Sequence, residues 1–505
     1  MVRKIIFLVV LLVLVVVPTQ AQDAPSGTLT IALPNEPTSL YLPRGADRTA
    51  GNASWPMYDS LVYLNDNNEI EPALAESWEV SEDGVTWTFH LREGVTFHNG
   101  EPFNADAVMA TWEFGSDASN DYASDYSNVT VEVIDEMTVA INTGEPDPIF
   151  LVDLADSWAI IPAGYMREVG IDDFANAPVG TGPFKFVERI PGDRVVYEAN
   201  LDYWQEGVPS VAEVIFRIIP DVSTRVAAIQ TGEVDIVNRL TVDDAAQLAG
   251  ANNVEVITYP NDRVYYVGFK NIGNGVGTPV ENALVRQAMN YAVNKEGIIQ
   301  GIFGGEAVPI SGFVVSTNLG YDDSIQPYPY DPDKARELLA EAGYADGFEV
   351  SMGCPTDAYT NINFVCLGIQ RDLGAVGIEV VLEFRTSNSY WNEVNYGTVG
   401  PMYVDSWSSA VGEALPRLQG ALLPGEYYNT WEDETITNLI NTIAGTVDRD
   451  ERVGLYGELQ AYMYDNPPFI YLYQLNLFEA VNTRVQGYHP RPAENYFLLN
   501  VTVTE

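Results

Sequence analysis

The sequence predicts an α/β protein built from about three interleaved domains. Its 505 residues exceed the roughly 100–200 residues of a single domain. The hydrophobic fraction of 46% is large enough to form extensive cores and excludes a disordered chain. Predicted strands dominate residues 183–220, whereas helices and strands alternate from residue 283 onward. Because neither an internal repeat nor a low-complexity linker interrupts the chain, we expect domains that interleave.

The N-terminus is typical of a secretory signal peptide. Arg3 and Lys4 precede an apolar run at 5–17, and small residues precede a predicted cleavage after Ala21. The run is shorter than the ~20 apolar residues of a membrane helix, which argues against an uncleaved anchor. We therefore expect residues 1–21 to be removed and the mature protein to be exported, either periplasmic or extracellular, and soluble.

Strand patterns open the mature chain. The first predicted strand spans 28–33, and residues 85–103 alternate between apolar and polar side chains up to a tight turn at Asn99-Gly100. A helix is predicted to begin at 104 or 105, and a second hairpin lies between 129 and 141. The apolar face of the 85–103 segment comprises Trp87, Phe89, Leu91 and Phe97. These patterns predict α+β structure for residues 55–177.

The rest of the chain predicts a mixed sheet covered by helices. A helix at 221–231 ends at Gly232, and a strand at 264–269 could pass between two lobes. Asp331-Pro332 begins a helix with a capping residue followed by proline. The remaining predicted elements are a parallel βαβ unit from 348 to 383, helices at 433–445 and 450–464, and a returning strand at 469–473.

Charge and missing motifs narrow the function classes. Lys and Arg number 25 against 71 Asp and Glu, a net charge of −46, which disfavours binding to nucleic acid or anionic lipid. The three histidines match no zinc motif, and neither a nucleophile elbow nor a phosphate-binding loop occurs. We therefore expect no metal, no cofactor and no catalytic residue. A hydrolase with a carboxylate pair remains an alternative, because so many acids cannot be excluded by counting.

The two cysteines are Cys354 and Cys366. An exported protein can form a disulfide, and closure of this short loop is worth about 3 kcal/mol on the entropic model. Two buried thiols are the alternative, and we favour the bridge only slightly.

Several blocks, in order, closely resemble the extracellular solute-binding protein family 5, the peptide, nickel and oligosaccharide receptors of ABC importers. The first block is Pro-Ala-Leu-Ala-Glu-Ser-Trp at 72–78, and Gly-Thr-Gly-Pro-Phe at 180–184 matches another. The full set of blocks is 72–78, 83–100, 105–108, 180–184, 200–204, 232–236, 285–292 and 330–339. The resemblance covers residues 27–505. Core periodicity explains most of these residues, so they identify the family without identifying its ligand.

The resemblance implies a two-lobed periplasmic-binding-protein fold of type II, cluster C, with an extra inserted α+β domain and a hinge. Lobe one would comprise 27–54, 178–262 and 485–505, the inserted domain 55–177, and lobe two 263–484. Hinges would lie near 263–270 and 473–484. The protein would be the substrate-binding component of an ABC importer, a monomer that captures a solute by closure and delivers it to a membrane permease.

The expected ligand contacts are aromatic and hydroxyl side chains. They are Trp407, Tyr403, Asp405, Ser406, Ser408, Trp55 and Tyr58. In peptide-binding relatives an Asp three residues after the Trp pairs with the ligand amine, but here that position is Ala410. An Arg that holds the carboxylate would align with Asn363 or Phe364.

These replacements make free peptides a doubtful ligand and favour a neutral polyol such as an oligosaccharide. Asp405 or Glu413 could replace the missing acid, so an oligopeptide stays open. Nickel would need His ligands or a chelator, and direct coordination by three scattered histidines is disfavoured.

Overall fold

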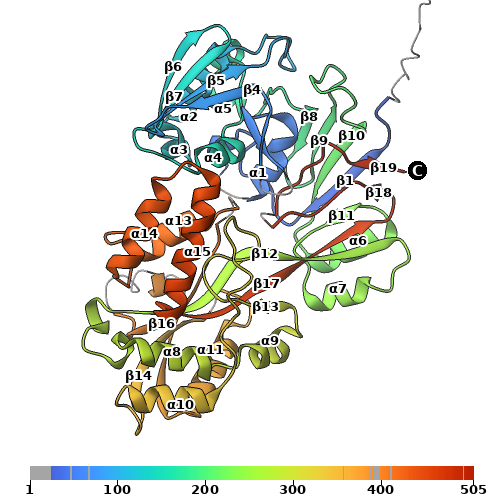
Figure 1. The fold of residues 1–505 in the computed structure, drawn as a ribbon. Helices are drawn as coiled ribbons and strands as arrows, with labels where there is room; N and C mark the ends of the chain where they lie inside the picture. Colours follow the sequence, from blue (N-terminus) through green and yellow to red (C-terminus); the bar gives the residue numbers. More distant parts are fainter. Residues whose placement is uncertain are drawn as a thin grey trace, which may run out of the picture.

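One large sheet runs through both lobes (Figure 1). The computed structural model describes residues 24–45, 48–65, 69–356, 358–386, 389–391, 398–409, 412–492 and 494–504. The sheet has eleven strands in the order β15-β14-β16-β12-β17-β11-β1-β10-β9-β8, and β13 pairs with β17 beside this path. The predicted signal peptide at 1–21 lies outside the described residues. Across the described chain, no helix combines the length and apolar character needed to cross a membrane.

Lobe one surrounds β1, at the right of Figure 1. Strand β1 pairs in parallel with β10 and β11, and five of its six residues are buried. The side chain of Asp221 caps α6, which ends at Gly232 in the left-handed conformation, as predicted. The elements are β1 (Thr28–Leu33), α1 (Arg48–Ser54), β8 (Phe184–Ile190), β9 (Arg194–Ala199), β10 (Glu213–Ile218), α6 (Val222–Thr231), β11 (Ile236–Val237), α7 (Val242–Leu248), β18 (Val485–Gln486) and β19 (Thr502–Val503).

The inserted domain has its own four-stranded antiparallel sheet, in the order β4-β5-β7-β6. Trp87, Phe89 and Leu91 share a buried face, which confirms their predicted place in a core. Residues 92–103 do not continue as strand, and only the bridge between Thr96 and Pro102 remains. The elements are β2 (Val62–Leu64), β3 (Ile70–Pro72), β4 (Ala75–Val80), β5 (Thr86–Leu91), α2 (Ala105–Gly115), α3 (Ala123–Ser127), β6 (Thr130–Asp135), β7 (Thr138–Asn142), α4 (Phe150–Ser157) and α5 (Ala163–Phe174).

Lobe two contains the predicted parallel βαβ unit, formed by β14, α11 and β15. Cys354 on β14 and Cys366 on α11 form a disulfide with their Cα atoms 6.5 Å apart, which confirms the favoured bridge. The elements are α8 (Ala283–Ala292), α9 (Lys295–Phe303), β13 (Ala307–Pro309), α10 (Pro332–Glu341), β14 (Phe348–Pro355), α11 (Ile362–Gly374), β15 (Ile378–Arg385), β16 (Met402–Trp407), α13 (Leu415–Leu422), α14 (Glu434–Ala444) and α15 (Arg449–Asp465).

Two long antiparallel strands join the lobes, β12 (Val254–Phe269) and β17 (Phe469–Asn482). The pairing register with β17 shifts between Pro260 and Val264, and β12 pairs with β16 on its other side from Val264 onward. Proline cannot donate to a ladder and is tolerated at such an irregularity. The strand predicted at 264–269 is therefore the second half of a longer one, and Asn261, Asp262 and Arg263 lie at the crossing.

Candidate functional site

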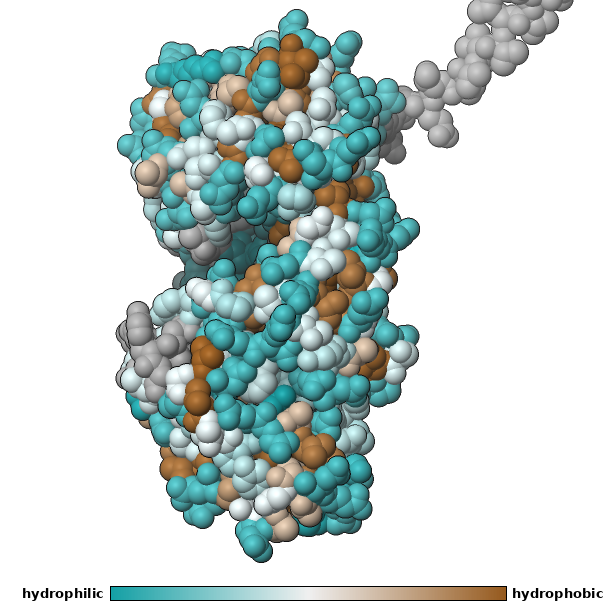
Figure 2. Space-filling model, turned by 60° about the vertical axis from the view of Figure 1, so that its left-hand side comes forward, coloured by the Kyte–Doolittle hydropathy of each residue, from teal (hydrophilic) through white to brown (hydrophobic). Residues whose placement is uncertain are grey.

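The surface is hollowed between an upper and a lower mass, as Figure 2 shows. A cavity of about 500 Å³ lies where lobe one, the inserted domain and the crossing strands meet. Its lining includes Arg48 and Trp55 near the start of the chain, Asp156 at the end of α4, Arg263 on β12 and Ser408 after β16. We call this space the outer cavity. Residues far apart in sequence meet there, as expected for a ligand site between lobes.

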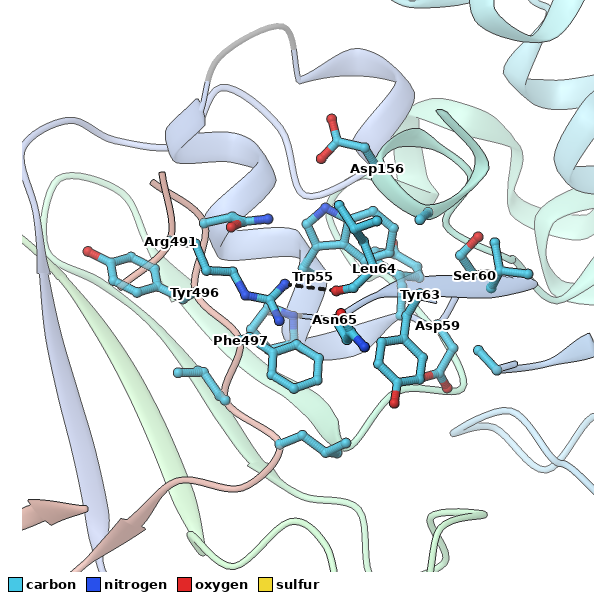
Figure 3. A pocket seen from close by; sticks show the side chains of 18 of the residues that line it. Trp55, Asp59, Ser60, Tyr63, Leu64, Asn65, Asp156, Arg491, Tyr496 and Phe497 are labelled. Carbon is cyan, nitrogen blue, oxygen red and sulfur yellow. Dashed lines mark hydrogen bonds between the residues drawn. The ribbon is translucent and has the colours of Figure 1, made fainter. Parts of the chain in front are cut away.

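A second, smaller space adjoins the outer cavity and is shown in Figure 3. Its volume is about 180 Å³, and most of its lining comes from residues 55–65, 152–156, 203–205 and 491–499. The two spaces share four lining residues, namely Trp55, Asp156, Asp262 and Pro492. We call the smaller space the inner pocket. The shared residues make it an extension of the outer cavity.

Arg263 is held at the crossing by two serines. Its guanidinium donates to the hydroxyl oxygen of Ser406 at 2.8 Å and to that of Ser408 at 3.3 Å. Among the described residues, no carboxylate lies within ion-pair distance of it, although the chain carries a net charge of −46. Serine hydroxyls orient a guanidinium without neutralising it, so Arg263 has no direct ion-pair partner there, although its charge acts on the buried carboxylate of Asp405.

Three other charged side chains of the outer cavity take part in no ion pair among the described residues. They are Arg48 on α1, Asp125 on α3 and Asp156 on α4. By contrast, Arg239 is paired with Glu494 at 2.8 Å on the same cavity wall. Unpaired charges of both signs therefore face one solvent-filled space.

A buried cluster of hydrogen-bonded side chains lies next to the crossing, around Asp262. The carboxylate of Asp262 accepts from Arg417 at 2.7 Å, from the backbone N–H of Ser409 at 2.6 Å and from Asn318 at 3.2 Å. Burial raises the pKa of Asp262, and Arg417 acts in the opposite direction. Because Asp262 precedes Arg263, this cluster fixes the backbone from which the Arg263 side chain departs.

Further titratable groups are buried elsewhere. Glu479 on β17 accepts hydrogen bonds from Tyr259 and Tyr488, and burial raises its pKa to about 7. In the inserted domain, burial lowers the pKa of His98 to about 4, and its ring contacts the backbone oxygen of Gly182 at 2.9 Å. Across the described residues, no group of three or more His, Cys, Asp or Glu side chains could hold a metal ion.

The predicted contacts are divided between the cavities and the protein interior. Trp55 lines both spaces, Tyr58 lines the inner pocket with its hydroxyl donating to the Leu40 carbonyl, and Ser408 lines the outer cavity. Ser406 lines neither space and instead accepts a hydrogen bond from Arg263.

The other three predicted contacts line neither of the two cavities. Tyr403 is 2% exposed, and its hydroxyl bonds to that of Thr430. Asp405 is 4% exposed and accepts from Tyr359 at 2.7 Å, and burial raises its pKa to about 6. Trp407 packs edge-on against Tyr428 at 5.0 Å between ring centroids.

The next positions are those at which peptide-binding relatives carry charged ligand contacts. Ala410 lies outside the described residues. Asn363 and Phe364 lie in the first turn of α11, and Phe364 is 55% exposed beside α9. Sequence reasoning missed Arg48, Asp156 and Arg263, since no motif surrounds them.

Comparison with known proteins gives a consistent assignment. Residues 69–429 match the model of the bacterial extracellular solute-binding proteins, family 5. Heme-binding protein A of Haemophilus influenzae is 30% identical, covering 94% of this chain and 92% of the relative. The dipeptide-binding protein of Escherichia coli is 30% identical over 89% and 90% of the two chains. The structure of HbpA2 from Haemophilus parasuis is 27% identical, with a TM-score of 0.88 and coverage of 95% and 100%.

Proposed function

The chain belongs to the bacterial extracellular solute-binding proteins of family 5, and we propose that its ligand is a short peptide or peptide-like zwitterion. The protein is the substrate-binding component of an ABC importer with the two-lobed periplasmic-binding-protein fold. The observation that carries the ligand proposal is the set of unpaired charges in the outer cavity. The comparisons give no support to the alternative of a carboxylate-dependent hydrolase, and we propose that the protein performs no catalysis.

Charge complementarity assigns a role to each group. Arg263 and Arg48 would bind the ligand carboxylate, since guanidinium and carboxylate form strong charge-assisted hydrogen bonds. Asp156 would bind the ligand amine. A neutral sugar would leave these charges in the closed site without ion-pair partners, and burial of an unpaired charge is costly. The sequence lacks the expected charged partners at Ala410 and at Asn363 or Phe364, which disfavoured peptides. The structure has charged residues at other positions of the cavity, and these favour peptides.

We keep the predicted contacts in two groups. Trp55, Tyr58 and Ser408 would touch the ligand, because they line the cavities. Ser406 would position Arg263. The remaining three, Tyr403, Asp405 and Trp407, would shape the wall of lobe two behind that contact surface.

Capture would proceed by closure of the lobes around the crossing strands. We retain the proposed division into lobe one (27–54, 178–262 and 485–505), the inserted domain (55–177) and lobe two (263–484). A ligand that touches both lobes stabilises the closed form by its differential affinity. We propose that cleavage after Ala21 yields an exported monomer, which delivers its solute to a membrane permease.

The test uses the mature chain, residues 22–505, and isothermal titration calorimetry with a panel of dipeptides. We expect free dipeptides to bind, and N-acetylated or C-amidated analogues to bind much more weakly. Arg263→Gln should weaken free dipeptides about 10- to 100-fold, the value of a hydrogen bond to a charged group. Arg336→Gln, on the exposed face of α10, is the matched control and should bind as the wild type does.

Neutral oligosaccharides are the comparison ligands. Binding of oligosaccharides together with no binding of any dipeptide would overturn the proposal. Equal affinity for free and doubly capped peptides would also overturn it, because the unpaired charges would then have no role.

A further inference from the structure

The inner pocket extends from the charged outer cavity and shares Asp156 with it. We propose that the inner pocket is a subsite for an aromatic ring of the ligand, formed jointly by the inserted domain and lobe one. The inference rests on the proposed function and specifies the ligand as a peptide-like zwitterion with an aromatic side chain.

The volume of the inner pocket suits one six-membered ring. It measures about 180 Å³. A cavity of about 150 Å³ lined by apolar side chains is large enough to bind benzene. A phenyl group therefore fits in the inner pocket.

The walls are mostly aromatic and aliphatic. Tyr63 and Phe497 lie face to face, with ring centroids 6.0 Å apart and planes inclined by 18° (Figure 3). Trp55 lies behind them in the same view, and the guanidinium of Arg491 stands 4.4 Å above the Phe497 ring. Rings of this kind bind an aromatic group through offset or edge contacts.

Several polar side chains around the inner pocket already make hydrogen bonds within the protein. Asp59 accepts from Tyr203 at 2.8 Å and from the indole N–H of Trp204 at 3.1 Å. Ser60 donates to the backbone oxygen of Leu154 at 2.6 Å, and the hydroxyl of Tyr63 donates to Glu71. A polyol would have to break these bonds to satisfy its hydroxyl groups, whereas a phenyl ring would leave them intact.

The lining of the pocket includes buried polar atoms without a hydrogen-bond partner among the described residues, two of which lie on consecutive residues. These two are the side-chain oxygen of Asn495 and the hydroxyl of Tyr496. Figure 3 shows the Tyr496 hydroxyl directed away from the middle of the pocket. The side-chain oxygen of Asn495 could accept one hydrogen bond from a ring substituent, such as a phenol. The pocket therefore accommodates a phenyl or phenol ring and excludes a polyhydroxylated one.

The position of the inner pocket links it to the charges. Trp55, Asp156 and Asp262 line both spaces, so a ligand whose charged groups lie in the outer cavity can extend its side chain inward. Burial of a phenyl group is worth about 1.5–3 kcal/mol, which corresponds to roughly 10- to 150-fold in affinity. We expect Gly-Phe or Phe-Gly to bind more tightly than Gly-Gly by a factor in this range.

The experiment fills the pocket without removing any polar contact. Ala155 lines the pocket from α4, so Ala155→Phe should occupy the space intended for the ligand ring. In calorimetry, this variant should bind Gly-Gly as the wild type does and lose its preference for the phenyl dipeptides. Ala340→Phe, at an exposed position of α10 in lobe two, is the matched control and should keep the preference. Phe497→Ala is a second variant, and it should reduce phenyl-dipeptide affinity at least threefold, with Gly-Gly binding unchanged.

The outcomes separate this inference from the proposed function. If wild-type protein binds Gly-Gly as tightly as both phenyl dipeptides, the subsite is refuted while zwitterion recognition stands. Retention of the phenyl preference in both Ala155→Phe and Phe497→Ala refutes it as well. If Arg263→Gln binds every dipeptide as tightly as the wild type, the proposed charge recognition fails, whatever the pocket variants do.

Discussion

The buried pair of Asp262 and Arg417 provides the most demanding test of how the crossing is stabilised. Arg417 is fully buried, and Asp262 is 6% exposed. Removing one member of a buried pair costs about 3 to 5 kcal/mol, because the other charge is left without its partner. In Arg417→Met, Asp262 would still accept from Ser409 and Asn318. We therefore expect the lower end of that range, about 3 kcal/mol.

The cost should depend on pH in a defined direction. Burial already raises the pKa of Asp262, and loss of Arg417 removes an opposing effect, so the pKa rises further in the variant. An acid whose pKa is raised by folding contributes stability below its unfolded pKa, and this contribution is lost as pH rises through the folded pKa. The variant should therefore be closer to wild type at pH 5 than at pH 8.

Urea unfolding followed by circular dichroism at both pH values measures this effect. The double variant Asp262→Asn/Arg417→Met should be less destabilised than the sum of the single variants, because the charge that was stranded is gone. Two buried nitrogens of Arg417 have no partner among the described residues, so methionine also removes an existing penalty. A cost below 1 kcal/mol at pH 8, or a cost that grows as pH falls, would refute the reasoning.

Other predictions concern buried titratable groups and the disulfide. Burial raises the pKa of Glu479 to about 7, so the contribution of this acid to stability is lost as pH rises toward 7. In urea unfolding, Glu479→Gln should therefore be more stable than wild type at pH 8 but not at pH 4. Burial lowers the pKa of His98 to about 4, so the free energy of unfolding falls as pH drops from 6.5 toward 4. NMR should show a neutral His98 ring at pH 5.5, and a charged ring would contradict this prediction. Replacing Cys354 and Cys366 by alanine should cost about 3 kcal/mol, and a loss below 1 kcal/mol would mean that the bridge adds little.

Local sequence patterns predicted the helices and strands well where capping residues and alternating apolar residues determine the structure. Asp331 caps α10 and accepts from the backbone N–H of Lys334, as its position before Pro332 indicated. The alternation of Trp87 and Phe89 placed both in a core. The strand before residue 264 was missed, because Pro260 masks its continuity and because tertiary pairing with β17 stabilises it.

The candidate site was harder to predict because it depends on contacts between distant segments. Arg263 acquires its role from Ser406 and Ser408, more than 140 positions later in the chain. Arg48 and Asp156 gain significance only because lobe one and the inserted domain place them on one cavity. In a chain with 71 acidic residues, no local pattern distinguishes Asp156 from the other acids. Five of the seven predicted contacts lie at 403–408 and the other two are Trp55 and Tyr58, whereas the charges without ion pairs lie at other positions.

The interleaving of lobe one has a consequence for synthesis of the protein. Strand β11 pairs with the end of β17, and the backbone N–H of Asn482 donates to the oxygen of Asp235 at 2.7 Å. Tyr488, Tyr496 and Val501 complete the core around β1, which the ribosome makes first. Lobe one therefore cannot close while the last residues are still being translated. Strand β1, the first described strand to be synthesised, therefore gains the last of its packing partners only when the C-terminal segment is complete.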